Sequence, residues 1–352
     1  MNLLDRHVGA YVIRGTLLAL LVLVGLFTLT EFVEDLESVG KGAYTMSRAI
    51  EYMLLKLPGR IFQLFPESAL IGSLAGLGIL ATNSELIVVR ASGVSVGRIC
   101  LSVMKSGGIL MLVALLIGEL IAPPCEKYAQ KKRSLALSSH LALKTGGWLR
   151  DGSTFINIRE VLANDRMANI YIYEFDKKNR LRFATHAREA RYVEDQWLLE
   201  DIEQSEVNHS AVVRNKISKA AWKSVFEPEL VDVITEKPDS LSALGLFRYF
   251  RFLEANGLST SRYRLALWEK LIHPLAVGVM IFLAIPLVLG KLRSVGLGQR
   301  ILVGIIVGIA FYVTQQTAVQ MGIVYGLTPF LSAVVPTASF FAVGLWLIRR
   351  LR

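Results

Sequence analysis

Basic side chains gather just beyond one long apolar stretch of the chain. Lys127, Lys131, Lys132 and Arg133 follow the apolar run that ends near Ala122. The planar guanidinium of arginine offers a fork of donors that suits a phosphate, and lysine adds compact positive charge. The cluster predicts a phosphate-recognition site or, as the plainer alternative, an anchor to lipid head groups.

A second candidate is segment 83–97, which joins two apolar stretches. Ser84 can cap a short helix, Glu85 falls in the positively polarised first turn, Leu86 belongs to its apolar side, and Gly93 stands near its end. Such a helix could act as a rigid lever between two membrane helices. It could equally be a capped connector in the head-group region.

Patterns of catalytic, nucleotide or metal chemistry are missing from the sequence. Gly290-Lys291-Leu292 lacks the glycine spacing and the Ser/Thr of a phosphate-binding loop, and the five histidines follow no zinc or protease motif. Cys100 and Cys125 fall at opposite ends of one expected helix, so they cannot pair. We expect no catalytic, cofactor or metal residues in this chain, and energy for any work must come from a partner.

The elements that position these residues follow from composition. Of 352 residues, 53% are hydrophobic and 19% charged, and the mean hydropathy is +0.46. Residues 123–267 hold 23 of the 39 Lys and Arg and 19 of the 29 Asp and Glu. This uneven distribution indicates a membrane protein with one inserted water-soluble domain.

Six stretches are long and apolar enough to cross about 30 Å of hydrocarbon as helices. They are roughly residues 11–33, 61–81, 99–122, 271–289, 301–321 and 329–348. No cleavage motif follows the first stretch, which is therefore expected to be a retained span. Lys and Arg are more frequent in the flanks on the side of the N-terminus, so both termini are expected inside and the inserted domain outside.

The inserted domain alternates apolar and polar residues as antiparallel strands do. Strands are expected at 154–158, 170–173, 180–193, 197–202 and 211–217, with a turn at 176–179, forming a sandwich or open roll. Residues 239–256 change to helical spacing.

Several residues inside the spans carry further expectations. Glu67 is expected in a protein-lined or water-filled cavity, whereas Glu119 is expected at an interface. The pairs Gly72/Gly76 and Gly304/Gly308 allow close helix approach, and most such pairs serve packing alone.

The chain resembles the lipopolysaccharide-export permeases of the YjgP/YjgQ family. The resemblance covers the whole chain in matching order and rests on many short motifs together. These are Asp5-Arg6, Phe65-Pro66, the run from Leu70 to Gly78, Ser84-Glu85-Leu86, Ala91-Ser92-Gly93, the run from Ser102 to Lys105, Gly118-Glu119, Ala122-Pro123, Arg262-Tyr263, Leu267-Trp268, the run from Leu292 to Val295, Val324-Tyr325-Gly326 and the run from Pro336 to Phe341.

The resemblance implies an α-helical membrane protein of six transmembrane helices (3+3) with an inserted all-β, jellyroll-like periplasmic domain. Residues 1–122 would hold helices one to three and a coupling helix at about 83–97, residues 123–267 the β domain with a helical connector, and residues 268–352 helices four to six. It implies a permease subunit of an exporter in the inner membrane of a Gram-negative bacterium. Its partners would be an LptF-type permease, two copies of an LptB-type ATPase that uses ATP and Mg, and an LptC-type single-span protein.

Site roles are likewise implied by the resemblance. Glu85, Leu86 and Arg90 would couple to the ATPase, with Glu85 meeting a basic residue there. Spans one and five would form lateral gates with the partner permease. Contacts to lipopolysaccharide would come from Arg133, Lys132, Lys41, Phe27, Phe311 and Tyr312.

The outer end of span one departs from the family. Where relatives carry lysines, this chain has Glu31, Glu37 and Ser38. Carboxylates repel phosphate, so that contact is not carried over. Divalent cations could bridge the two anions, or the partner could supply the basic charge.

Two other functions remain open from the sequence. One is an envelope-lipid-modifying enzyme with its active domain in the periplasm, and the other is a membrane adaptor that only binds partners. A helix that docks an ATPase would speak against both.

Overall fold

The computed structural model describes residues 3–137, 142–145, 148–151, 153–162, 166–176, 180–193, 196–207, 212–222, 238, 241–255, 260–290 and 295–350. The chain divides into two compact units. We call residues 1–35, 53–126 and 261–352 the membrane unit, and residues 36–52 and 127–260 the β unit.

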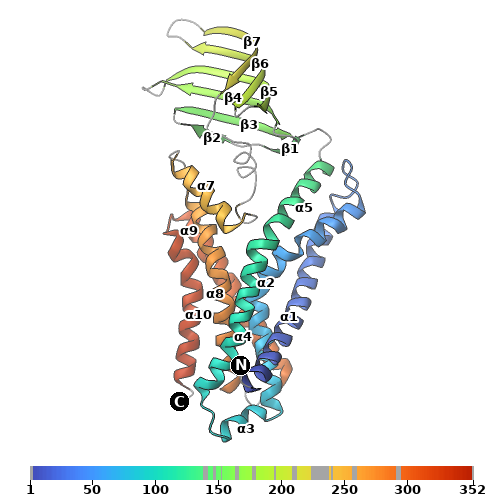
Figure 1. Cartoon of the computed structure of the whole chain (residues 1–352), viewed down its shortest axis with the longest axis vertical. Helices are drawn as coiled ribbons and strands as arrows, with labels where there is room; N and C mark the ends of the chain where they lie inside the picture. The colour runs from blue at the N-terminus through green and yellow to red at the C-terminus, as the bar shows by residue number, and fades with distance from the viewer. Residues whose placement is uncertain are drawn as a thin grey trace. The chain divides into compact units, whose positions relative to one another are not determined.

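Six helices of the described chain are long and apolar enough to cross a membrane (Figure 1). They are α1 (Leu3–Leu36), α2 (Met46–Thr82), α4 (Val96–Leu116) with its continuation through the π-helical η1 (Ile117–Ile121) and α5 (Ala122–Leu137), α8 (Ser261–Leu289), α9 (Leu297–Val324) and α10 (Pro329–Arg349). All six predicted spans are therefore confirmed. Most of the helices extend well beyond the predicted apolar segments, because hydropathy reports only the part of a helix that lies in hydrocarbon.

The short helix α3 (Glu85–Ala91) joins α2 to α4, as segment 83–97 predicted. The predicted role of Ser84 as a side-chain cap was wrong. Its backbone is left-handed, with φ 59° and ψ 7°, and its hydroxyl makes no capping bond. Only two residues, Asn83 and Ser84, separate α2 from α3, whereas a capping side chain needs an extended backbone. Ser95 has that backbone, and its hydroxyl accepts from the Arg98 N–H at 3.3 Å at the start of α4.

Glycines bring three helices of the membrane unit into backbone contact. A Cβ at Gly72 of α2 would overlap the backbone of Gly15 and Thr16 in α1. A Cβ at Gly304 of α9 would lie 2.9 Å from the Leu74 side chain of α2. Both predicted glycine pairs therefore serve close helix packing. The core around them is apolar and includes Leu70.

The β unit contains one antiparallel seven-stranded sheet. Its strands are β1 (Ala142–Thr145), β2 (Trp148–Asp151), β3 (Thr154–Leu162), β4 (Arg166–Phe175), β5 (Leu181–Val193), β6 (Gln196–Val207) and β7 (Val212–Trp222). The order is β1-β3-β4-β5-β6-β7, and β2 also pairs with β3. The five predicted strands correspond to β3 to β7, and β1 and β2 were not predicted. The turn expected at 176–179 lies largely outside the described residues.

Alternating residues build the core of the sheet. Ile156 of β3, Ile170 of β4 and Trp197 of β6 are buried on one face. Phe252 of the helix α7 (Ala243–Ala255) packs against this core. Helix α7 confirms the helical spacing expected at 239–256, and six membrane helices with an inserted β domain confirm the predicted fold class.

Candidate coupling and lipid-contact sites

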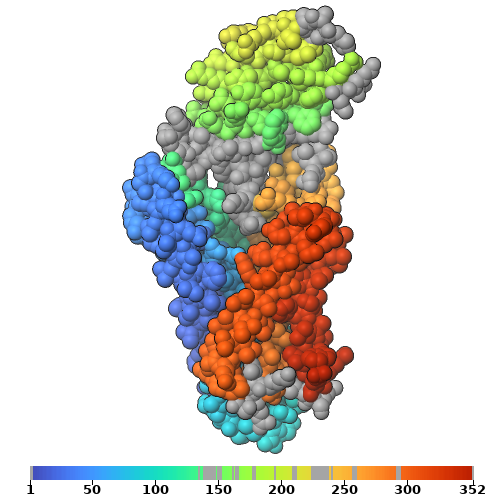
Figure 2. Space-filling view, turned by 180° about the vertical axis from the view of Figure 1, so that it is seen from behind, coloured from blue at the N-terminus to red at the C-terminus, as the bar shows by residue number. Residues whose placement is uncertain are grey.

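Helix α3 has two apolar sides. One packs against the rest of the membrane unit, and the other is exposed. Leu86 is only 4% exposed and belongs to the unit's own core. Ile87 and Val88 are 40% and 65% exposed, and Arg90 is also exposed. Figure 2 shows α3, in cyan, uncovered at the lower end of the membrane unit. The prediction that Leu86 packs against a partner was therefore wrong, since its side chain holds α3 onto its own chain.

Sequence reasoning assigned Leu86 and its neighbouring apolar positions to this contact without naming Ile87 and Val88, although the signal was present. In a seven-residue helix, Leu86 and Val89 occupy one side. The remaining apolar residues of the run must then lie on the other side. They are the side chains that a partner can cover.

Glu85 is held in place by the first turns of α1 and by its own loop. Its Oε2 lies 2.7 Å from His7 Nε2, and its Oε1 accepts from Asn83 Nδ2 at 3.3 Å. These hydrogen bonds, first of all the one with His7, lower the pKa of Glu85 below its ordinary value. Glu85 is thus a carboxylate at neutral pH. It carries a fixed negative charge beside the exposed face of α3.

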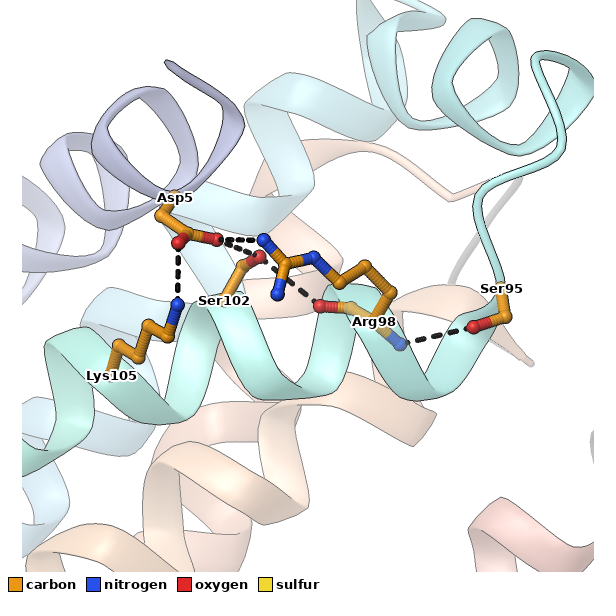
Figure 3. Close-up of polar contacts among 5 residues, drawn as sticks. All are labelled: Asp5, Ser95, Arg98, Ser102 and Lys105. Atoms are coloured by element: carbon orange, nitrogen blue, oxygen red, sulfur yellow. Dashed lines mark hydrogen bonds and ion pairs between the residues drawn. The ribbon is translucent and has the colours of Figure 1, made fainter. Parts of the chain in front are cut away.

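A buried ion cluster joins the start of α1 to α4 (Figure 3). Asp5 of α1 is fully buried. Its carboxylate accepts from Lys105 Nζ at 2.6 Å, Ser102 Oγ at 2.5 Å and Arg98 at 3.3 Å, all from α4. Asp5 matched a family motif in the sequence, but no pattern there indicated that it pairs with a helix more than ninety residues away.

The β unit brings together part of the predicted basic cluster. The Arg133 guanidinium lies 5.1 Å from the ring centre of Tyr52 and 5.9 Å from that of Tyr44, and it donates to Ser38 Oγ at 3.3 Å. Lys41 is exposed. Both rings lie within cation–π distance of the guanidinium and leave its charge in place.

Lys132 has a different environment from Arg133. Its ammonium forms an ion pair with Glu51 and lies 4.7 Å from the ring centre of Tyr128. Because Glu51 neutralises it, Lys132 contributes less positive charge than the sequence suggested.

The acidic outer end of α1 is partly neutralised within the chain. Glu31 forms ion pairs with Lys56 and Arg60, both on α2. Two positive charges face one negative charge, so Glu31 does not present an uncompensated anion. Glu37 is exposed.

The three aromatic residues predicted to touch acyl chains differ in exposure. Phe27 and Tyr312 are 46% and 44% exposed on α1 and α9. Phe311 is fully buried, with its ring centre 5.1 Å from that of Phe340 on α10. Phe311 therefore belongs to the packing of α9 on α10 and is not available to an acyl chain outside the bundle.

Two predicted ionisable residues of the spans lie inside the membrane unit. Glu67 is buried against Gly308 of α9, and within the described part of the chain its Oε2 has no hydrogen-bond partner. Glu119, in η1, lies 3.8 Å from Lys270 of α8. No group of three or more His, Cys, Asp or Glu that could hold a metal occurs among the described residues.

Six helices long and apolar enough to span a membrane, an exposed connector helix and an inserted β-sheet domain define the fold of a polytopic membrane protein. The family model of the lipopolysaccharide export system permease LptF/LptG matches residues 6–350. The chain therefore belongs to this family of transport permeases, whose members are not enzymes.

Individual relatives agree with the family match over the full length. The chain is 36% identical over 356 residues to the lipopolysaccharide export system permease protein LptG of Haemophilus influenzae, covering 100% of this chain and 99% of that protein. It is 36% identical over 354 residues to LptG of Escherichia coli K12, covering 99% and 98%. The motifs in the sequence also look closest to the LptG subunit, and these matches confirm that prediction.

Proposed function

We propose that this lipopolysaccharide export permease extracts lipopolysaccharide from the inner membrane of a Gram-negative bacterium and passes it to a periplasmic bridge toward the outer membrane. ATP hydrolysis in a separate subunit drives the transport, and ATP and Mg are used there. This chain binds no cofactor of its own. The observation that carries the proposal is α3, an exposed helix between two spans with a fixed carboxylate beside an apolar face.

The partners follow from that surface and from the family. An LptB-type ATPase docks on α3, with Ile87 and Val88 in an apolar groove and Glu85 against a basic side chain. Arg90 lies at the rim of this contact. Two ATPase copies, an LptF-type permease and an LptC-type single-span protein complete the complex.

The orientation in the membrane places α3 and both chain ends in the cytoplasm and the β unit in the periplasm. Two observations support it. Lys and Arg are enriched in the flanks on the N-terminal side. The contact of His7 with Glu85 puts the start of α1 and α3 at the same end of the membrane unit.

Lipid contacts are proposed for residues at the outer side. Lys41 and Arg133 bind phosphate groups, and Lys132 contributes when its pair with Glu51 opens. Phe27 and Tyr312 touch acyl chains at the lateral faces of α1 and α9. The compensation of Glu31 by Lys56 and Arg60 removes the need for a cation bridge at that residue.

Native mass spectrometry of the protein purified gently from its own membranes tests the proposal. We expect one copy together with a second permease, two ATPase copies and bound lipopolysaccharide. Glu85→Lys should abolish ATPase association by placing like charges together, while Glu34→Lys, at an exposed position at the other end of α1, should not. A homo-oligomer without ATPase, or unchanged association of Glu85→Lys, contradicts the proposal.

A further inference from the structure

The two least covered spans of the membrane unit each carry one buried charge near their first turn. For α1 and for α9, 22% of the helix's 18-residue apolar window is buried within the chain, compared with 72% for α2. Asp5 of α1 and Arg300 of α9 are nevertheless 0% and 1% exposed. A buried charge is costly unless it is paired, so each of these side chains requires its partners.

Asp5 binds the helix that follows α3. Its partners Arg98, Ser102 and Lys105 lie one turn apart along a single face of α4 (Figure 3). One turn further along α1, a Cβ at Gly9 would lie 3.3 Å from Ser106 Cβ, so the two helices stay close there. The start of α1 is thus fixed to the start of α4.

Arg300 binds the helix that precedes α3. Its guanidinium donates to the Gly78 carbonyl oxygen and, at 2.9 Å, to Thr82 Oγ1, both in the last turns of α2. A Cβ at Gly78 would lie 2.8 Å from Arg300 Nη1, so only glycine leaves room for this contact. The start of α9 is thus fixed to the end of α2.

These two contacts lie where α1 and α9 approach each other. Figures 1 and 2 show that α1, in blue, and α9, in orange, are close at the end that carries α3 and diverge away from it. Two helices that are held at one end and diverge at the other pivot about the end where they are held. A small tilt of α3 with its flanking helices is therefore enlarged at the far ends of α1 and α9.

We propose that Asp5 and Arg300 are positioning residues that transmit movement of α3 to α1 and α9, so that ATPase motion changes the spacing of these two helices on the lipid side. His7 adds a direct contact from α1 to Glu85 of α3. The inference rests on the proposed function, because it needs an ATPase that moves α3. It adds the side chains by which that movement reaches the helices that face lipid.

The test uses the complete complex in proteoliposomes, with ATP hydrolysis and release of lipopolysaccharide to an added acceptor measured together. Asp5→Asn and Arg300→Gln should leave complex assembly and ATP hydrolysis near wild type and lower the lipopolysaccharide released per ATP by about fivefold or more. Lys105→Gln, which removes one of the partners of Asp5 at a half-exposed site, should act in the same direction more weakly. Glu34→Gln is the matched control on α1 and should have no effect.

Spin labels show whether the movement is transmitted. In a Cys100→Ser, Cys125→Ser background, labels at Ser92→Cys after α3 and Leu18→Cys in α1 should keep one distance with and without ATP, because the two elements move together. With Lys105→Gln or Asp5→Asn, ATP should change that distance.

The outcomes separate the two proposals. If the wild-type complex releases lipopolysaccharide with ATP, the Asp5 and Arg300 variants match its release per ATP, and the Asp5 variant keeps its label distance, the transmission inference alone is overturned. If the wild-type complex shows no ATP-dependent release, the proposed function is overturned, and the transmission inference with it.

Discussion

A histidine of α8 replaces a backbone hydrogen bond that is missing beside Pro66 of α2. Pro66 has no N–H, so the carbonyl of Phe62, four residues earlier, loses its helical donor. His273 Nε2 of α8 lies 2.7 Å from that oxygen. Since a carbonyl can only accept, the Nε2 atom carries the proton and donates it. Inside a membrane such a repair matters, because water is not there to replace it.

We expect His273→Leu to destabilise the protein by about 1–3 kcal/mol, because it leaves the Phe62 carbonyl unsatisfied. The apparent melting temperature in detergent should fall accordingly. His273→Gln keeps a donor at similar reach and should restore most of the loss. Equal melting temperatures for the Leu and Gln variants would show that the hydrogen bond contributes nothing.

Candidate site residues could be predicted from the sequence where their charge marked them. The direction in which each side chain points, and the partner it meets, could not. Glu85 and Arg133 stand out by charge and position. Leu86 was assigned to the wrong partner because a seven-residue helix has two apolar sides, and only the packing of α3 shows which one faces inward. The pairing of Asp5 with α4 depends on tertiary structure and has no local signal.

At the proposed lipid-contact site, the shape of the cation should matter as much as its charge. We expect Arg133→Lys to bind lipopolysaccharide more weakly than wild type by several-fold, because lysine keeps the charge but lacks the planar fork of donors and the guanidinium contacts with Tyr44 and Tyr52. Arg133→Ala should be weaker still. Binding is measured on the purified complex at fixed salt, and equal affinities for the Lys and Arg proteins would argue against a planar contact.

Helices α1 and α2 depend on backbone contact between glycines. The separation of these two helices is set by Gly15 and Gly72, since either Cβ would overlap the opposite backbone. Gly72→Ala should therefore force the helices apart and lower stability by about 1–3 kcal/mol, although alanine favours a helix.

Gly108 of α4 is the matched control for this substitution. A Cβ at Gly108 meets nothing within 4 Å, so Gly108→Ala should be neutral or stabilising. Both variants are compared by apparent melting temperature in the same detergent. Helix propensity favours alanine over glycine, so a loss of similar size in both variants would show that the close contact with α1 is not its cause.

Element identity was well predicted, because 20-residue apolar runs and alternating strands are strong periodic signals. Element ends were predicted less well. Helix α2 starts at Met46, well before the predicted 61, since its first turns are polar and continue past Pro58. The π-helical η1 was not predicted either. There the ring of Phe62 fills the space beside Gly118, a contact that only the packed bundle determines.

For the whole molecule, we expect the partner permease of the proposed function to pack where the spans are least covered. The apolar windows of α1 and α9 are 22% buried, against 67% for α8 and 72% for α2. Their uncovered residues include Leu26 and Ile306, which are 60% and 58% exposed. An LptF-type partner that covers these two residues would complete the bundle and leave the remaining apolar surface, Phe27 and Tyr312 included, to lipid.

Cysteine cross-linking tests this arrangement in the intact membrane. In a Cys100→Ser, Cys125→Ser background, Leu26→Cys and Ile306→Cys should cross-link to the co-expressed partner permease through a short bifunctional reagent. Leu112→Cys on α4, at 56% exposure, has similar access to lipid and should not. If Leu112→Cys reacts with the partner and the other two do not, α4 forms the interface, and movement of α1 and α9 cannot open a passage between the two permeases.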